Sequence, residues 1–185
     1  MNPPNQKRVL ALDVRRRSLG FVVLESPDNF LDWGVKSFRG GVNAVRIPLP
    51  QKLATLLSQF RPDLLVMKRP VAKGRRTTIG TVLRVAEKRR VPVQLVSPTS
   101  VRKTFRCPDR NKHEIATATA ARSIEFADLL PAKRRPWESE HYRMSMFDAA
   151  ALGLTYFDRQ RRHAVRKKAL PERSHRLRHV RSVAR

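Results

Sequence analysis

Short apolar runs dominate the first forty residues of the chain. The first run covers residues 9–12 and is closed by Asp13, as in a short buried strand that ends in a carboxylate. Residues 19–25 form a second run that is rich in β-branched and aromatic side chains. A turn signal, Ser-Pro-Asp-Asn at 26–29, precedes a third predicted strand at 30–38. Because these connections are short, we expect the three strands to form an antiparallel meander.

From residue 50 onward, helical and strand patterns alternate. Leucines at helical spacing predict a helix that ends at Phe60, before Arg61-Pro62. Strands are then predicted at 63–68 and 91–96, and helices at 77–90, 111–126 and 143–156. In the helix at 111–126, Ile115, Ala118 and Ile124 are the expected core positions. A meander followed by alternating helices and strands predicts an α/β fold with a mixed five-stranded sheet flanked by helices.

Charge is the most informative feature of the composition. The 185 residues include 40 Lys and Arg against 15 Asp and Glu, a formal net charge of +25. Such an excess repels itself unless a polyanion neutralises it, so nucleic acid is the expected partner. We expect one domain at residues 1–158, followed by a basic, flexible tail at 159–185.

The sequence also bears on the compartment. Cys107 is the single cysteine, which excludes an internal disulfide and a zinc site made of several cysteines. No apolar run approaches the length of a membrane span, and the first eight residues are polar. We therefore expect a cytoplasmic protein with no membrane partner.

Four stretches carry a resemblance to a known family. Residues 8–13, followed by Gly20 and an apolar strand, resemble the opening hairpin of the RuvC-type Holliday-junction resolvases. Residues 31–34, 62–68 and 146–153 are similar to the third strand, the central strand and the final helix of that family, and they occur in the same order. The resemblance covers the chain up to the basic tail and implies a ribonuclease-H-like fold.

The resemblance further implies an endonuclease whose clustered carboxylates hold Mg²⁺ or Mn²⁺. Asp13 and Asp148 match the first and last carboxylate positions of the family. Lys68 stands where the central strand carries Glu, and Ser145 stands one turn before Asp148 where the helix carries a second Asp. We expect the Lys68 ammonium to pair with the remaining carboxylates and to repel a divalent cation. If the protein is inactive, no cofactor is expected.

Two further groups of residues are candidates for the site. The missing metal ligands could come from a partner chain or from the segment before the last helix, which contains Glu138, Glu140 and His141. Arg15 stands where the family carries a glycine, close to Asp13. The expected nucleic-acid contacts are Arg15, Arg16, Arg17, Lys73, Arg75, Arg76, Arg166, Lys167 and Lys168.

Three functions remain open on the sequence. The first is a catalytically inactive module that binds structured or branched nucleic acid, and the second is a metal-dependent endonuclease with a rearranged, degenerate site. The third is an RNA-processing factor of ribonuclease-H-like fold. The resemblance favours DNA over RNA as the partner, and a Holliday junction as the substrate. It also implies a homodimer, although no feature of the sequence shows one.

Overall fold

The computed structural model describes residues 7–38, 48–70, 76–107 and 111–169. Its centre is a five-stranded sheet in the order β3-β2-β1-β4-β5. The strands are β1 (Val9–Val14), β2 (Ser18–Ser26), β3 (Asn29–Ser37), β4 (Leu64–Lys68) and β5 (Val93–Val96). β1, β2 and β3 pair antiparallel, whereas β4 pairs parallel with both β1 and β5. The predicted mixed α/β sheet is therefore confirmed, with its opening meander.

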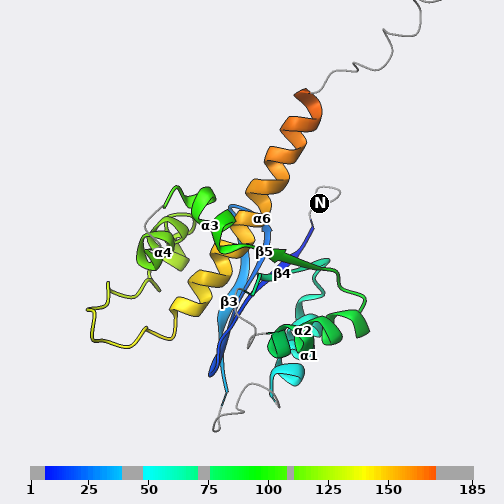
Figure 1. Ribbon diagram of the computed structural model, residues 1–185, viewed down its shortest axis with the longest axis horizontal. Coiled ribbons are helices and arrows are strands. Elements are labelled where there is room, and N and C mark those ends of the chain that lie inside the picture. Colours follow the sequence, from blue (N-terminus) through cyan, green and yellow to red (C-terminus); the bar gives the residue numbers. More distant parts are fainter. Residues whose placement is uncertain (1–6, 39–47, 71–75, 108–110, 170–185) are drawn as a thin grey trace, which may run out of the picture.

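Helices cover both faces of the sheet and make three layers (Figure 1). On one face lie α1 (Pro48–Phe60) and α2 (Arg76–Lys88). On the other lie α3 (Pro98–Phe105), α4 (Lys112–Ala120), α5 (Ile124–Ala127) and α6 (Met144–Ala169). Among the described residues, no helix has the length and apolar character that crossing a membrane requires.

Side-chain alternation along β1 explains the two cores. Leu10 and Leu12 are buried in a cluster with α1 and α2, whereas Val9 and Ala11 are buried in a cluster with α6. Successive residues of a strand point to opposite faces, so a strand buried on both sides must be apolar at every position. β1 is apolar up to Asp13, where its carboxylate reaches the end of the sheet.

Two glycines allow α6 to lie close to the sheet. A Cβ on Gly20 of β2 would overlap the backbone carbonyl of Ser145, and a Cβ on Gly153 would come within 2.6 Å of the Leu24 side chain. Gly20 is paired with Asp13 across the β1–β2 hairpin. This close approach brings the first turns of α6 to the end of β1 that carries Asp13.

The single helix predicted at 111–126 is wrong, because the chain breaks between α4 and α5. Ile115 is buried as expected, but Ala118 is exposed and Ile124 is 84% exposed. The break turns the chain so that Phe126 enters the core, where its ring lies 4.5 Å from that of Phe147 between centroids. α3 was not predicted at all.

The last helix is longer than the sequence pattern predicted. α6 continues to Ala169, so the expected boundary at residue 158 falls inside one continuous helix. Residues 159–167 are exposed throughout. The rest of the expected tail, at 170–185, lies outside the described residues.

Candidate active site

Three carboxylates from distant parts of the chain meet at one end of the sheet. Asp13 is buried at the end of β1, and Asp148 lies on the second turn of α6. Glu140 belongs to the segment that leads into α6. The sequence resemblance predicted the first two as site residues, and Glu140 was one of three candidates for a replacement ligand.

Arg15 lies at the centre of this carboxylate cluster. Its Nε donates to Asp13 Oδ2, one terminal nitrogen to Glu140 Oε2 and the other to Asp148 Oδ2, each at 2.7 Å. Every nitrogen of the guanidinium therefore contacts a different carboxylate, and only 21% of the side chain is exposed. Charge-assisted bonds of this length are the strong class of protein hydrogen bond. The prediction that Arg15 contacts nucleic acid stays a prediction; in the structure its guanidinium is bonded to the three carboxylates.

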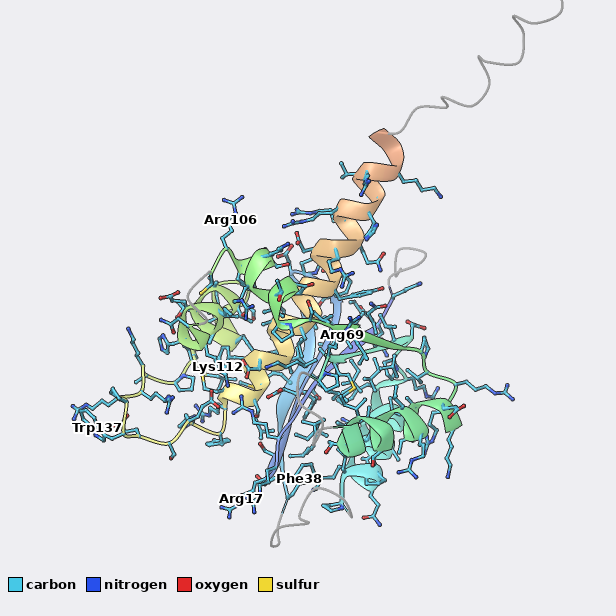
Figure 2. All side chains as sticks on the ribbon, viewed as in Figure 1. Arg17, Phe38, Arg69, Arg106, Lys112 and Trp137 are labelled. Atoms are coloured by element: carbon cyan, nitrogen blue, oxygen red, sulfur yellow. The ribbon has the colours of Figure 1, made fainter. Side chains whose placement is uncertain are left out.

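A second cation closes the cluster. The ammonium of Lys112, at the start of α4, lies 3.0 Å from Glu140 Oε1 and 3.6 Å from Asp148 Oδ2. Figure 2 shows Lys112 beside the first turns of α6. Half of its side chain is exposed, so solvent screens this pair more than those of Arg15. Three negative charges are thus balanced in large part by two cations of the same chain.

The pKa values reflect this crowding. Burial and then the neighbouring Asp13 charge raise the pKa of Asp148, against the opposite effect of Lys112 and Arg15. For Glu140, burial alone would raise the pKa, but the Lys112 hydrogen bond and the charges of Arg15 and Lys112 lower it. Burial disfavours the charged Arg15, yet attraction to Asp13 and the other carboxylates raises its pKa further above the ordinary value. The guanidinium is therefore a permanent cation in this position.

Lys68 and Ser145, which stand where the family carries carboxylates, do not contribute to the cluster. Lys68 ends β4 next to Asp13, because Leu12 pairs with Met67 in the β1–β4 register. Its ammonium makes no ion pair with any described carboxylate, so the predicted pairing of Lys68 with Asp13 and Asp148 is wrong. Arg15 takes that role. Ser145 is fully buried and donates its hydroxyl to the Tyr142 carbonyl at 2.9 Å.

The other two candidates from the segment before α6 lie outside the cluster. Glu138 accepts a hydrogen bond from the backbone N–H of Arg135 within its own loop. His141 accepts one from the N–H of Arg143, and its ring packs against Tyr142. Figure 2 shows Trp137 at the outer tip of this segment, where its side chain is exposed.

The predicted nucleic-acid contacts are placed unequally. Arg16 and Arg17 are exposed in the β1–β2 turn, a few residues from the cluster, and Figure 2 shows Arg17 at the outer end of the sheet. Arg166 and Lys167 are exposed on α6. Lys73 and Arg75 lie outside the described residues. Arg76 is the first residue of α2, and Lys168 is the second-last residue of α6. The structure describes the backbone of both residues but not their side chains.

The arrangement does not fit the divalent metal that the resemblance implies. The described residues contain no group of three or more Asp, Glu, His or Cys side chains placed to hold a metal ion. The three carboxylates converge, but the oxygen that each directs inward is bonded to Arg15. A metal in that place would face a guanidinium and an ammonium at contact distance, and such repulsion opposes its binding.

Comparison with known proteins places the fold. No protein-family model and no curated protein sequence matches the chain. Among solved structures, Thermus thermophilus RuvC in complex with a Holliday junction substrate has a TM-score of 0.61 and 20% identity, over 85% of this chain and 96% of that one. The chain has the resolvase fold.

Two more resolvases with different sequences support this assignment. The yeast mitochondrial Holliday junction resolvase has a TM-score of 0.59 and 16% identity, over 89% of this chain and 85% of its own. Fowlpox virus resolvase, in complex with junction DNA, has a TM-score of 0.55 and 9% identity, over 83% of this chain and 98% of its own. The ribonuclease-H-like resolvase fold expected from the sequence is confirmed.

Proposed function

We propose that this protein binds branched DNA, with four-way junctions as its preferred form, and that it does not cleave DNA through a metal-ion mechanism. The observation that carries the proposal is the set of three ion pairs between Arg15 and Asp13, Glu140 and Asp148, of which the first and last match carboxylate positions of the resolvase family. A cation of the chain neutralises the position from which a metal ion would act. The protein keeps the scaffold and loses the metal chemistry.

Charge and fold together support DNA as the partner. The net charge of +25 favours a polyanion, because binding releases counterions from the phosphates. Two of the similar solved structures are resolvases in complex with Holliday junction DNA. Arg16 and Arg17 are exposed near the carboxylate cluster and supply phosphate contacts at that end, with Arg166 and Lys167 at the other. Lys73, Arg75, Arg76 and Lys168 complete the proposed set of contacts.

A gel-shift titration tests this function. Labelled four-way junction, linear duplex of the same sequence, single strand and duplex RNA are each titrated in EDTA, and unlabelled duplex serves as competitor. We expect the junction to bind most tightly and to resist duplex competitor. The double variant Arg16→Gln/Arg17→Gln should weaken junction binding. The control Arg84→Gln/Lys88→Gln changes two exposed residues of α2, on the face of the sheet that α6 does not cover, and should weaken binding less. Equal affinity for junction and linear duplex would contradict the proposal, and preference for duplex RNA would favour an RNA-processing role.

A metal-dependent endonuclease is the second candidate, and one observation favours it. Asp13, Glu140 and Asp148 each bond to a nitrogen of the same Arg15 guanidinium, and carboxylate oxygens are the ligands that a hard divalent cation prefers. This function requires the Arg15 side chain to leave the cluster when DNA binds. It predicts Mg²⁺- or Mn²⁺-dependent cutting that Asp13→Asn and Asp148→Asn each abolish, with binding retained.

The homodimer implied by the resemblance stays a prediction. Light scattering coupled to size-exclusion chromatography measures the mass directly, against 21.3 kDa for one chain. A mass near twice this value is expected if two copies bind the symmetric junction.

A further inference from the structure

The second half of α6 is a basic helix that leaves the body of the protein. Residues 144–156 are almost all buried against the sheet, whereas every residue from 159 to 167 is exposed. In Figure 1 this orange end of α6 projects beyond the sheet and the other helices. We call residues 159–169 the α6 arm. At 1.5 Å per residue, the arm extends about 16 Å.

The α6 arm carries positively charged side chains on several sides. Of the nine residues from 159 to 167, five are Arg or Lys and none is acidic. With about 100° between successive residues, Arg159, Arg162 and Arg166 form one stripe. Arg161 and Lys167 lie on either side of that stripe. An arm of this kind has no apolar stripe to bury against another helix, which argues against a protein core as its partner.

The α6 arm is anchored at its base but not along its length. Asp158 accepts one hydrogen bond from the Thr104 hydroxyl of α3 at 3.1 Å and pairs with Arg161 and Arg162 at 3.5 and 2.9 Å. Further along, Arg162 and Arg166 are like charges at i and i+4, a spacing that destabilises an isolated helix. A dense row of negative charge would remove this repulsion and hold the arm helical.

We propose that the α6 arm lies in the major groove of B-form duplex DNA; this inference rests on the proposed DNA-binding function. An α-helix is about 10–12 Å across with its side chains, and the major groove of B-DNA is about 12 Å wide. Phosphates line both walls of the groove, so a helix charged on several sides suits it better than one charged on a single face. The major groove of A-form RNA is deep and narrow and excludes such a helix, so the arm favours DNA over RNA duplex.

The salt dependence of binding tests this inference. The variant Arg159→Gln/Arg166→Gln/Lys167→Gln removes three charges and leaves the anchor at Asp158 in place. The slope of log K against log salt is negative, and each lost phosphate contact makes it shallower by about 0.9. We therefore expect the magnitude of the slope for duplex DNA to decrease by about 2 to 3. The matched control, Arg84→Gln/Lys88→Gln/Arg89→Gln, removes three exposed charges from α2 and its end and should lower it by less than 1. All six side chains are exposed, and Arg89 also donates a hydrogen bond to Ser58 at 2.6 Å, so the melting temperature of each variant is measured alongside and should stay close to the wild-type value.

Each result has a definite meaning. A large fall in slope for duplex DNA, with little change for duplex RNA, supports groove binding by the arm. An unchanged slope, or equal falls in the arm and control variants, overturns it. Equal loss for RNA and DNA duplexes also overturns it, because the arm would then act as a general polyanion contact. If the wild-type protein binds no DNA at all, the proposed function itself fails, which this assay separates from failure of the arm.

Discussion

Arg15 decides how the carboxylates of this fold are used. It follows β1 two residues after Asp13, so an extended backbone directs both side chains to the same face of the sheet. From there the guanidinium also reaches Glu140 and Asp148, which lie more than 120 residues away along the chain. A side chain with five N–H donors and a permanent charge can satisfy three carboxylates at once, which Lys cannot do in the same plane.

Replacing Arg15 should show how much the folded state depends on its three ion pairs. Arg15→Ala leaves three carboxylates opposed mainly by the half-exposed Lys112, so we expect a loss of about 2 kcal/mol of unfolding free energy. This is below the ~3–5 kcal/mol of a fully buried pair, because the Arg15 side chain keeps some contact with water. For a chain of this size the melting temperature should fall by about 4 to 8 °C, measured by circular dichroism. Arg16→Ala, which removes an exposed neighbour, should change it little.

The same variant should respond to metal. Without the guanidinium, Asp13, Glu140 and Asp148 repel one another, so we expect them to attract Mn²⁺, which should recover part of the lost stability. The wild-type melting temperature should be the same in Mn²⁺ and in EDTA. Adding Asp148→Asn to Arg15→Ala should remove the recovery. An equal rise for wild-type and variant protein would show that Arg15 does not keep metal out.

Lys112 should matter less than Arg15. Its ammonium reaches the cluster from α4 with half of the side chain exposed, and exposed pairs contribute about 1 kcal/mol or less. Lys112→Ala should therefore lower the unfolding free energy by under about 1 kcal/mol in a urea titration. A loss as large as that of Arg15→Ala would contradict the ranking of the two cations.

At the scale of elements, the contact between α6 and β2 positions the site. Gly20 lets the backbone of α6 approach at Ser145, one turn before Asp148. Gly20→Ala should force the helix away and cost about 3 kcal/mol, by the same mechanism as an overpacked core. Gly80→Ala in α2 is the control: a Cβ there meets nothing within 4 Å, so helix propensity should stabilise the protein by up to about 1 kcal/mol. Thermal melts of both variants check this, and a tolerated Gly20→Ala would contradict the close packing.

The sequence predicts the sheet well and the site only in part. Strands such as β1 are apolar on both faces, and their short length and flanking polar residues favour a strand over a helix. α3 was missed because its eight residues carry few apolar side chains, and none of them is fully buried. Asp13 and Asp148 were found through the resemblance. Arg15 was noted close to Asp13 and was assigned to nucleic-acid contact, so the two-residue spacing was not used to predict an ion pair.

Other parts of the site gave no local signal. Lys112 is one of 40 basic residues, and its approach to Glu140 depends on how α4 packs against α6. Lys68 was expected to pair with Asp13 because it follows Met67, the partner of Leu12 in the neighbouring strand. In the structure Arg15, not Lys68, pairs with the Asp13 carboxylate. Contacts of this kind follow from the three-dimensional arrangement and not from spacing along the chain.

At the scale of the whole molecule, two regions of different character lie at opposite ends of one helix. The carboxylate cluster surrounds the first turns of α6, and the basic arm forms its last turns. Fourteen residues separate Asp148 from Arg162, about 21 Å along the helix axis or about six base pairs of DNA. A protein that binds a junction at one end can thus contact a duplex arm at the other. Under the proposed function, residues at both ends of α6 would contact DNA, whereas cleavage would depend on the carboxylate cluster alone.

The most direct test of this account is cleavage of a labelled four-way junction by the wild-type protein in Mg²⁺ and in Mn²⁺, with Asp13→Asn beside it. The account predicts that the junction is shifted on a native gel by both proteins and remains uncut on a denaturing gel in either metal. Cutting by the wild type that Asp13→Asn abolishes would contradict it, and would show that Arg15 leaves the carboxylates when DNA binds.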